Sequence, residues 1–259
     1  YHYFPRYFPF GYLGVDVFFV LSGFVITRSF VSKSPSFKSI IPFYKKRILR
    51  LLPALYAVLF TTFLLSVLFD PPHSTKNIGQ GIIATVTYLA NVFYYSEIDY
   101  FNPFQSESPL LHTWSLSLEE QFYLVFPILF VLTKRPKIRI YVLLSLIVIS
   151  LSIYLESDDT LYRHYMPQAR VWQLFLGTVL AIFSINQTFK NNLIHYISIV
   201  ILIGILFFFK PSYPSILVIL PLISALIIRP QKNIYHSPLI LLLGSLSYSL
   251  YLWHQPIIY

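Results

Sequence analysis

The chain has 259 residues, of which 56% are hydrophobic and 11% are charged. Soluble domains carry about 25% charged residues, so this composition excludes an ordinary soluble domain and indicates that lipid surrounds most of the chain. The absence of cysteine excludes disulfides and thiolate chemistry, and the net charge of +9, which can indicate nucleic-acid binding, is better explained by membrane topology.

Apolar runs of about 17–25 residues predict membrane-spanning helices. Eight such runs occur in chain order, at residues 14–31, 51–69, 117–133, 139–155, 168–185, 193–209, 213–228 and 236–259. A ninth run, 79–95, is weaker because it contains Gln80, Asn91 and several Thr and Tyr residues. The predicted fold class is therefore all-α, a polytopic transmembrane bundle of about eight spans.

The distribution of charge predicts the orientation of this bundle. Two basic segments, 45–50 and 134–139, are expected to be loops between spans. If 79–95 does not span, alternation puts 14 of the 19 cations on one side of the membrane, with none of the ten acids. By the positive-inside rule that side is cytoplasmic. We therefore predict that 79–95 is re-entrant or interfacial and that 70–116 lies on the outer face.

Charged residues at the outer ends of two spans are candidate functional groups. Acidic groups near a span are costly, which makes Asp16 a candidate, although it can simply complement the helix dipole. Arg170 begins another span and needs a carboxylate or a ligand; Asp16, Glu119 and Glu120 are its candidate partners. Ser22 and Gly23, in mid-helix, favour a seam of close helix packing over a catalytic serine.

A second group of polar residues precedes the span at 117–133. Ser117 and Glu120 fit a capping box, which predicts a helix start at Ser117 and accounts for Glu120 structurally. His112 can orient a substrate or relay a proton, but it can also be an ordinary interfacial histidine. The capping box does not explain Glu119, which is a further candidate, as is Ser115. Trp253 and His254 near the end of the last span are also candidates, although they can simply belong to an aromatic belt.

Lys46, Arg47 and Arg50 can bind phosphates on the cytoplasmic face, although positive-inside anchoring alone also explains them. The chain has no Gly-rich phosphate loop, no His-Glu-x-x-His metal spacing and no Gly-x-Ser-x-Gly elbow. We therefore predict no metal and no tightly bound cofactor.

Five sequence blocks resemble the acyltransferase-3 family of membrane O-acyltransferases, and they occur in the order found in that family. The blocks are FPFGYLGVDVFFVLSGFVITRSF, FYKKRILRLLPALY, SPLLHTWSLSLEEQFYLVFPILF, RVWQLFLGTVLA and LGSLSYSLYLWHQPII. They run from one end of the chain to the other, so residues 1–259 are expected to form one transmembrane acyltransferase domain. The middle block is similar to the subgroup that often carries a C-terminal SGNH domain.

The resemblance implies transfer of an acyl group, usually acetyl from acetyl-CoA, to hydroxyls of cell-envelope glycans. Lipopolysaccharide O-antigen, peptidoglycan and exopolysaccharides are the implied acceptors, and a bacterial inner membrane is the implied location. His2 matches the functional histidine at the end of the family's first helix. The family's accompanying arginine would precede Tyr1, and a further helix would follow Ile258. The chain is therefore expected to be a fragment of a ten-helix domain.

The resemblance also suggests roles for the candidate residues. His2 would act as the base, with Asp16, Glu119 or Glu120 beside it. His112, Ser115, Arg170, Trp253 and His254 would bind the acceptor or the acyl carbonyl, and the basic residues of 45–50 would hold the phosphates of CoA. A transporter or flippase for a lipid-linked sugar or anion is the competing class, because buried charges and a re-entrant segment suit it equally well. A membrane protein with a purely structural role is the third candidate class.

Overall fold

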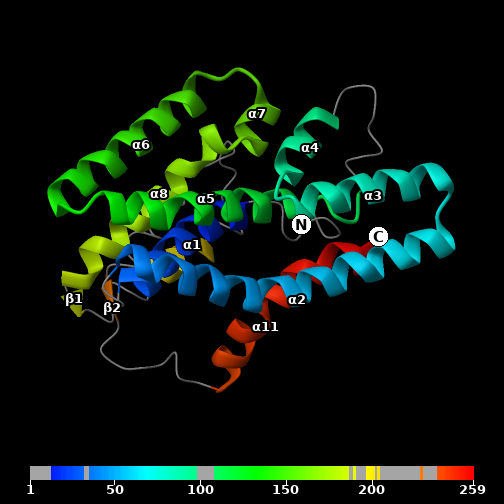
Figure 1. The fold of residues 1–259 in the computed structure, drawn as a ribbon, viewed down its shortest axis with the longest axis horizontal. Coiled ribbons are helices and arrows are strands. Elements are labelled where there is room, and N and C mark those ends of the chain that lie inside the picture. Colours follow the sequence, from blue (N-terminus) through cyan, green and yellow to red (C-terminus); the bar gives the residue numbers. More distant parts are fainter. Residues whose placement is uncertain are drawn as a thin grey trace. The chain divides into compact units, whose positions relative to one another are not determined.

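The structure is a computed structural model that describes residues 13–31, 35–97, 108–186, 189–190, 197–201, 203–204, 228–229 and 238–259. Helices dominate these residues (Figure 1), which confirms the predicted all-α class. The elements are α1 (Leu13–Val31), α2 (Phe37–Phe69), α3 (Pro72–Val86), α4 (Ala90–Glu97), α5 (Thr113–Leu132), α6 (Pro136–Glu156), α7 (Thr160–Tyr165), α8 (Pro167–Asn186), β1 (Phe189–Lys190), β2 (Ile228–Arg229) and α11 (Pro238–Ile258). The short strands β1 and β2 pair in parallel.

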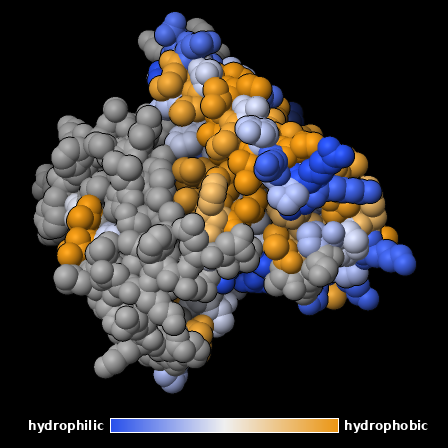
Figure 2. All heavy atoms as spheres, turned by 90° about the vertical axis from the view of Figure 1, so that its left-hand side faces the viewer, coloured by the Kyte–Doolittle hydropathy of each residue, from blue (hydrophilic) through white to orange (hydrophobic). Residues whose placement is uncertain are grey.

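Four of the described helices, α1, α2, α5 and α6, are long and apolar enough to cross a membrane. Many of their exposed side chains are large and apolar; Phe60 of α2 and Tyr141 of α6, for example, are 69% and 70% exposed. Figure 2 shows hydrophobic side chains over much of the coloured part of one face. Large exposed apolar surfaces are unusual on soluble proteins, so this surface is suited to lipid. The predicted spans at 193–209 and 213–228 lie wholly or largely outside the described residues.

Helix α2 corrects one prediction, because the basic segment 45–50 is helical and not a loop. The helix begins at Phe37 and continues for 33 residues through Pro42 and Pro53. Lys, Arg and Leu are good helix formers, so a run of charge does not by itself end a helix. Tyr44 Oη donates to the carbonyl oxygen of Leu124 at 2.6 Å, which places the start of α2 beside the C-terminal half of α5.

Helix α5 corrects a second prediction, because it begins at Thr113 and not at Ser117. Three tight-turn hydrogen bonds extend the helix backwards, from the N–H groups of 113–115 to the carbonyl oxygens of 110–112. Ser117 therefore lies in the second turn and cannot form the capping box that the sequence indicated. Its hydroxyl oxygen accepts a hydrogen bond from the N–H of Ala90 at 3.3 Å and ties α5 to the start of α4.

The weak run 79–95 does not form one span but is divided between α3 and α4. Helix α3 ends with Tyr88 in the left-handed conformation, φ 57°. The N–H of Leu89 donates to Ala84 O at 2.7 Å and that of Tyr88 to Thr85 O at 3.1 Å, the bond pattern of a Schellman ending. Gln121 of α5 donates to Tyr88 O at 2.7 Å and to Asn91 Oδ1 at 2.9 Å, so the interrupted backbone is satisfied inside the protein.

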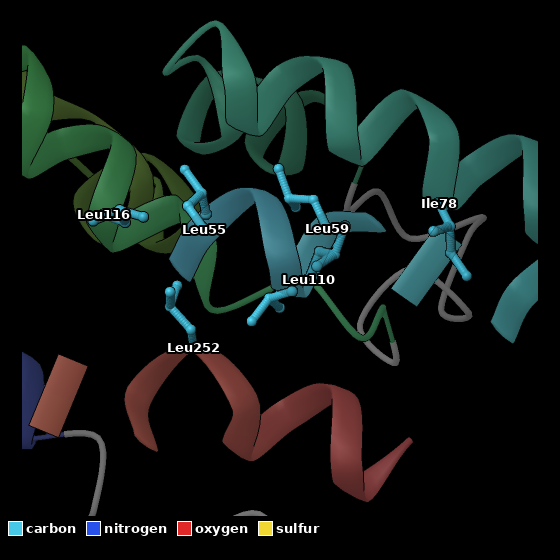
Figure 3. Close-up of a cluster of buried hydrophobic side chains, with 7 residues drawn as sticks. Leu55, Leu59, Ile78, Leu110, Leu116 and Leu252 are labelled. Atoms are coloured by element: carbon cyan, nitrogen blue, oxygen red, sulfur yellow. The ribbon is translucent and has the colours of Figure 1, made fainter. Parts of the chain in front are cut away.

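The chain divides into two compact units. Unit 1 contains residues 1–33, 134–153 and 170–236, and unit 2 contains residues 34–133, 154–169 and 237–259. In unit 2, leucines of α2, α5 and α11 pack with Ile78 of α3 around one apolar core (Figure 3). This core joins the beginning of α5 to the later part of α11, and so it fixes the polar residues beside it.

In unit 1, helices α1 and α8 approach so closely that only glycine fits at their crossing. A Cβ atom on Gly23 would lie 2.0 Å from the carbonyl oxygen of Leu174, and one on Gly177 would lie 2.1 Å from that of Val20. Thr27 donates a hydrogen bond to Thr178 Oγ1 at 3.1 Å within the same contact. The packing seam predicted at Gly23 is therefore present, and Gly177 completes it.

Candidate functional site

His112 lies at the start of α5, in unit 2, and contacts the later part of α11. Its side chain is 6% exposed. The backbone N–H of His112 donates to Gln255 Oε1 at 2.8 Å, and His112 Nδ1 lies 2.9 Å from the same oxygen. The Gln255 side chain therefore holds both the backbone and the ring of this histidine.

Tyr251, one turn before Gln255 on α11, completes the contact. Its hydroxyl donates to the carbonyl oxygen of His112 at 2.7 Å and is also hydrogen-bonded to Ser115 Oγ. The ring of His254 lies 4.9 Å from that of His112, centroid to centroid, and its Nδ1 is hydrogen-bonded to Tyr251 O. We call these five residues the His112 cluster: His112, Ser115, Tyr251, His254 and Gln255.

The cluster contains three of the predicted binding residues, namely His112, Ser115 and His254. Trp253 has a different place, because it packs against the apolar core of unit 2. The sequence analysis missed Tyr251 and Gln255. A signal for Gln255 was available, because a polar amide beside a histidine in an apolar run needs a hydrogen-bonding partner.

The short helix α7 adds an aromatic layer around α5. The ring of Trp114 lies 4.4 Å from that of His164 and 5.2 Å from that of Tyr165, centroid to centroid. Tyr165 is buried, and burial raises the pKa of its phenol to about 12, so it stays neutral at physiological pH. Asn91 of α4 donates to Tyr165 O at 3.2 Å and fixes the end of α7.

Asp159 caps α7, and this cap is expected to make stability depend on pH. Its Oδ1 accepts from the N–H groups of Tyr162 and Leu161 at 3.0 and 2.8 Å, and its Oδ2 accepts from the hydroxyl of Tyr95 at 2.8 Å. The bond from Tyr162 N–H is the main cause that lowers the pKa of Asp159, followed by the Tyr95 hydroxyl. The cap therefore stabilises the protein fully at pH values above the ordinary pKa of Asp. This stabilisation is lost as the pH falls through the lowered pKa of Asp159.

We expect Asp159→Ala to lower the free energy of unfolding by about 1 kcal/mol at pH 7, as for other lost N-caps. Thermal unfolding in detergent at pH 7 and in acid measures the difference from wild type, which should shrink in acid. Asp158→Ala is the matched control, since Asp158 is an exposed neighbouring carboxylate with no role in the cap. Equal losses in both variants would contradict the assignment.

Glu119 and Glu120 occupy different environments on α5. Glu119 is buried and accepts a hydrogen bond from the hydroxyl of Tyr123 at 2.8 Å. Glu120 is partly exposed, but its Oε1 is buried and makes no hydrogen bond to any described residue. The guanidinium of Arg47 lies 3.6 Å from the ring centroid of Tyr123 and acts electrostatically on Glu120. Lys46 and Arg50 are exposed on α2.

In unit 1, Arg170 and Asp16 form a buried ion pair. Their side chains are 0% and 1% exposed, and Arg170 Nη1 lies 2.7 Å from Asp16 Oδ1. Gln173 Nε2 donates to the same oxygen at 2.8 Å, a contact that the sequence analysis did not predict. Asp16, one of the three candidate partners named from the sequence, is therefore paired with Arg170. His2, the predicted base, lies outside the described residues.

The apolar helices, the interrupted α3–α4 hairpin and the buried polar clusters together define a polytopic helical membrane protein with polar sites inside each unit. Residues 1–259 match the family model of the acyltransferase domain. The chain belongs to that family, acyltransferase-3, as the sequence blocks indicated.

Two curated relatives resemble the chain along most of its length. O-acetyltransferase OatA of Staphylococcus aureus strain NCTC 8325 / PS 47 is 32% identical over 280 residues, which cover 96% of this chain and 46% of OatA. YrhL of Bacillus subtilis strain 168, provisionally named a peptidoglycan O-acetyltransferase, is 30% identical over 96% of this chain and 44% of its own length. The chain thus spans about half the length of these relatives. No solved structure matches it.

Proposed function

We propose that the protein is a membrane-embedded O-acyltransferase that moves an acetyl group from acetyl-CoA to hydroxyls of a cell-envelope glycan, and that peptidoglycan is the acceptor. Membership of the acyltransferase family supports the reaction, and the names of OatA and YrhL support the acetyl group and the acceptor. The observation that carries the proposal is the His112 cluster, where a buried imidazole is held in one orientation beside a second histidine.

The reaction exchanges the carbon–sulfur bond of the thioester for a carbon–oxygen bond of an ester and moves one proton. The acceptor hydroxyl oxygen bonds to the acyl carbonyl carbon, the carbon–sulfur bond of the thioester breaks, and the hydroxyl proton ends on the thiol. A base must take that proton as the bond forms. We propose His2 as this base, since a histidine is largely neutral near pH 7. Asp16, fixed and charged beside Arg170 and Gln173, is the proposed residue that orients it.

The donor and the acceptor are proposed to bind at opposite faces, so the acyl group of the donor must pass through the helical bundle to reach the acceptor hydroxyl. Lys46 and Arg50 are exposed basic residues on α2, suited to the phosphates of CoA. Arg47 is proposed to assist them from its position over Tyr123. The basic segments then face the cytoplasm of a bacterial cell, by the positive-inside rule, and the His112 cluster faces the glycan.

Membrane vesicles that contain the protein, supplied with acetyl-CoA labelled in the acetyl group, test the proposal. We expect label in peptidoglycan as an ester that mild base releases, and we expect His2→Ala to reduce this label at least 100-fold, the lower range for loss of a general base. His73→Gln, an exposed histidine on α3, is the matched control and should keep wild-type labelling. A transporter or flippase would give no base-labile label, and full labelling by His2→Ala would remove His2 from the mechanism.

A further inference from the structure

Helix α2 is too long to lie wholly within the hydrocarbon core of a membrane. Its 33 residues give a length of about 50 Å, whereas the core is about 30 Å thick. Spanning helices tilt by up to about 40°, which still leaves roughly 38 Å along the membrane normal. The apolar residues 51–69 are enough to cross the core, and all the cations of α2 lie before them. The segment 37–50 is therefore expected to reach the membrane surface.

One side of this segment is turned towards the protein. Tyr44 Oη donates to the carbonyl oxygen of Leu124 on α5 at 2.6 Å. The guanidinium of Arg47, about one turn later on α2, lies over the ring of Tyr123 of the same partner helix. Tyr44 and Arg47 are only partly exposed as a result. Contacts with α5 thus occupy one side of the segment, and the membrane can reach the other.

The exposed side of the segment carries a row of apolar residues with a row of lysines beside it. Phe37, Ile41 and Ile48 are 57%, 76% and 50% exposed, and their spacing of four and seven residues places them on one face of the helix. Lys38 and Lys45 are exposed too, and about two turns separate them, so they share the neighbouring face. Large apolar residues next to basic residues are typical of helices at a lipid–water interface.

No carboxylate of the described residues neutralises the two lysines. Helix α2 contains no Asp or Glu, and neither Lys38 nor Lys45 forms an ion pair with a described residue. Lys46 and Arg50, which are proposed to hold the phosphates of CoA, point about 100° further round the helix. Lys38 and Lys45 are therefore available to a different anionic group.

We propose that the face of α2 formed by Phe37, Lys38, Ile41, Lys45 and Ile48 binds anionic phospholipid headgroups at the membrane surface. The two ammonium groups bind lipid phosphates, and the three apolar side chains lie among the outer parts of the acyl chains. This face selects anionic lipids, because the cation of a zwitterionic headgroup repels the lysines. The inference goes beyond the proposed function and does not depend on it, since these five residues have no role in the proposed reaction.

The protein in uncharged detergent, titrated with fluorescent phosphatidylglycerol or with the matching phosphatidylcholine, tests this face. We expect wild type to prefer phosphatidylglycerol. Each basic residue near an anionic surface strengthens binding by about fivefold, so Lys38→Gln combined with Lys45→Gln should reduce the preference roughly 25-fold. Lys38→Arg combined with Lys45→Arg keeps both charges and should keep the preference. Lys76→Gln, at an exposed lysine of α3, is the matched control and should also keep it.

The preference is a ratio of two lipid affinities measured on one preparation, so it is insensitive to differences in yield between variants. Equal affinity of wild type for both lipids, or an unchanged preference in the glutamine double variant, would overturn the proposal. Excess CoA should leave bound phosphatidylglycerol in place, and its displacement would show that these lysines bind the phosphates of CoA instead. None of these readouts requires acetyl transfer, so failure here and failure of the proposed function are distinguishable.

A spin label tests the depth of the segment in the membrane. The chain has no cysteine, so Ile41→Cys and Phe60→Cys each introduce one labelling site. Phe60 is exposed in the middle of 51–69 and serves as the reference for the hydrocarbon core. In nanodiscs of phosphatidylcholine with phosphatidylglycerol, a water-soluble relaxation agent should reach the label at position 41 but not the label at position 60. The same depth for both labels would contradict a surface location of this face.

Discussion

Substitution of Gly23 or Gly177 by alanine is expected to prevent unit 1 from folding. The added Cβ atom would lie 2.0 Å from Leu174 O in the first variant and 2.1 Å from Val20 O in the second. Both obstacles are backbone atoms of a packed helix, which cannot move aside as a flexible side chain can. We expect each variant to lose about 3 kcal/mol or more, the upper range for overpacking. The yield of monodisperse protein in detergent and its thermal unfolding measure this loss.

Matched glycine variants control for effects of alanine itself. At Gly14 of α1 and Gly244 of α11, no atom of the described residues lies within 4 Å of an added Cβ atom, so Gly14→Ala and Gly244→Ala should fold as wild type does. Normal yield and unfolding temperature for Gly23→Ala would show that α1 and α8 do not cross as closely as the structure has them. Failure of all four variants would point to a requirement for backbone flexibility.

Hydropathy predicted most of the described helices, because the thickness of a bilayer sets the length of an apolar run. The weakness of the run at 79–95 also indicated correctly that it is not a simple span. Ser22 and Gly23 predicted a site of close helix packing, but the local sequence does not show which helix packs there. The partner of Gly23 is Gly177 of α8, which lies more than a hundred residues later in the chain and contacts α1 only in the folded protein.

The two wrong helix boundaries have local causes. The run at 45–50 was expected to be a loop because charge often marks loops in membrane proteins, yet its residues are strong helix formers and α2 continues through them. At α5, the Ser117–Glu120 pattern fits a cap, but the turn bonds to the carbonyls of 110–112 let the helix start earlier. Both errors reflect local signals that backbone hydrogen bonding overrides.

The sequence predicted several of the residues of the candidate site, but it did not predict which of them contact one another. His112, Ser115 and His254 were selected as polar residues at the ends of apolar runs, and the structure places them together. Gln255 stands next to His254 in the sequence, but its partner is 143 positions away on α5. A contact between residues so far apart in the chain is not visible in the local sequence.

Removal of either partner of the Asp16–Arg170 pair is expected to destabilise the protein strongly. The side chains are 1% and 0% exposed, so Asp16→Ala or Arg170→Ala removes one member of a buried ion pair and leaves the other charge buried. Such a loss costs about 3–5 kcal/mol in other proteins. Thermal unfolding in detergent should show this loss for both single variants. A surface ion pair would change stability by only about 0–1 kcal/mol, so a loss that small would contradict the buried pair.

The double variant Asp16→Leu with Arg170→Met separates the structural role of the pair from the proposed catalytic role of Asp16. Apolar residues of similar size often replace a buried pair without loss of stability, so folding should recover. Labelling of peptidoglycan from acetyl-CoA should not recover, because the carboxylate proposed to orient His2 remains absent. If both folding and labelling return, the pair serves the packing of α1 against α8 alone, and the residue that orients the base must be sought elsewhere.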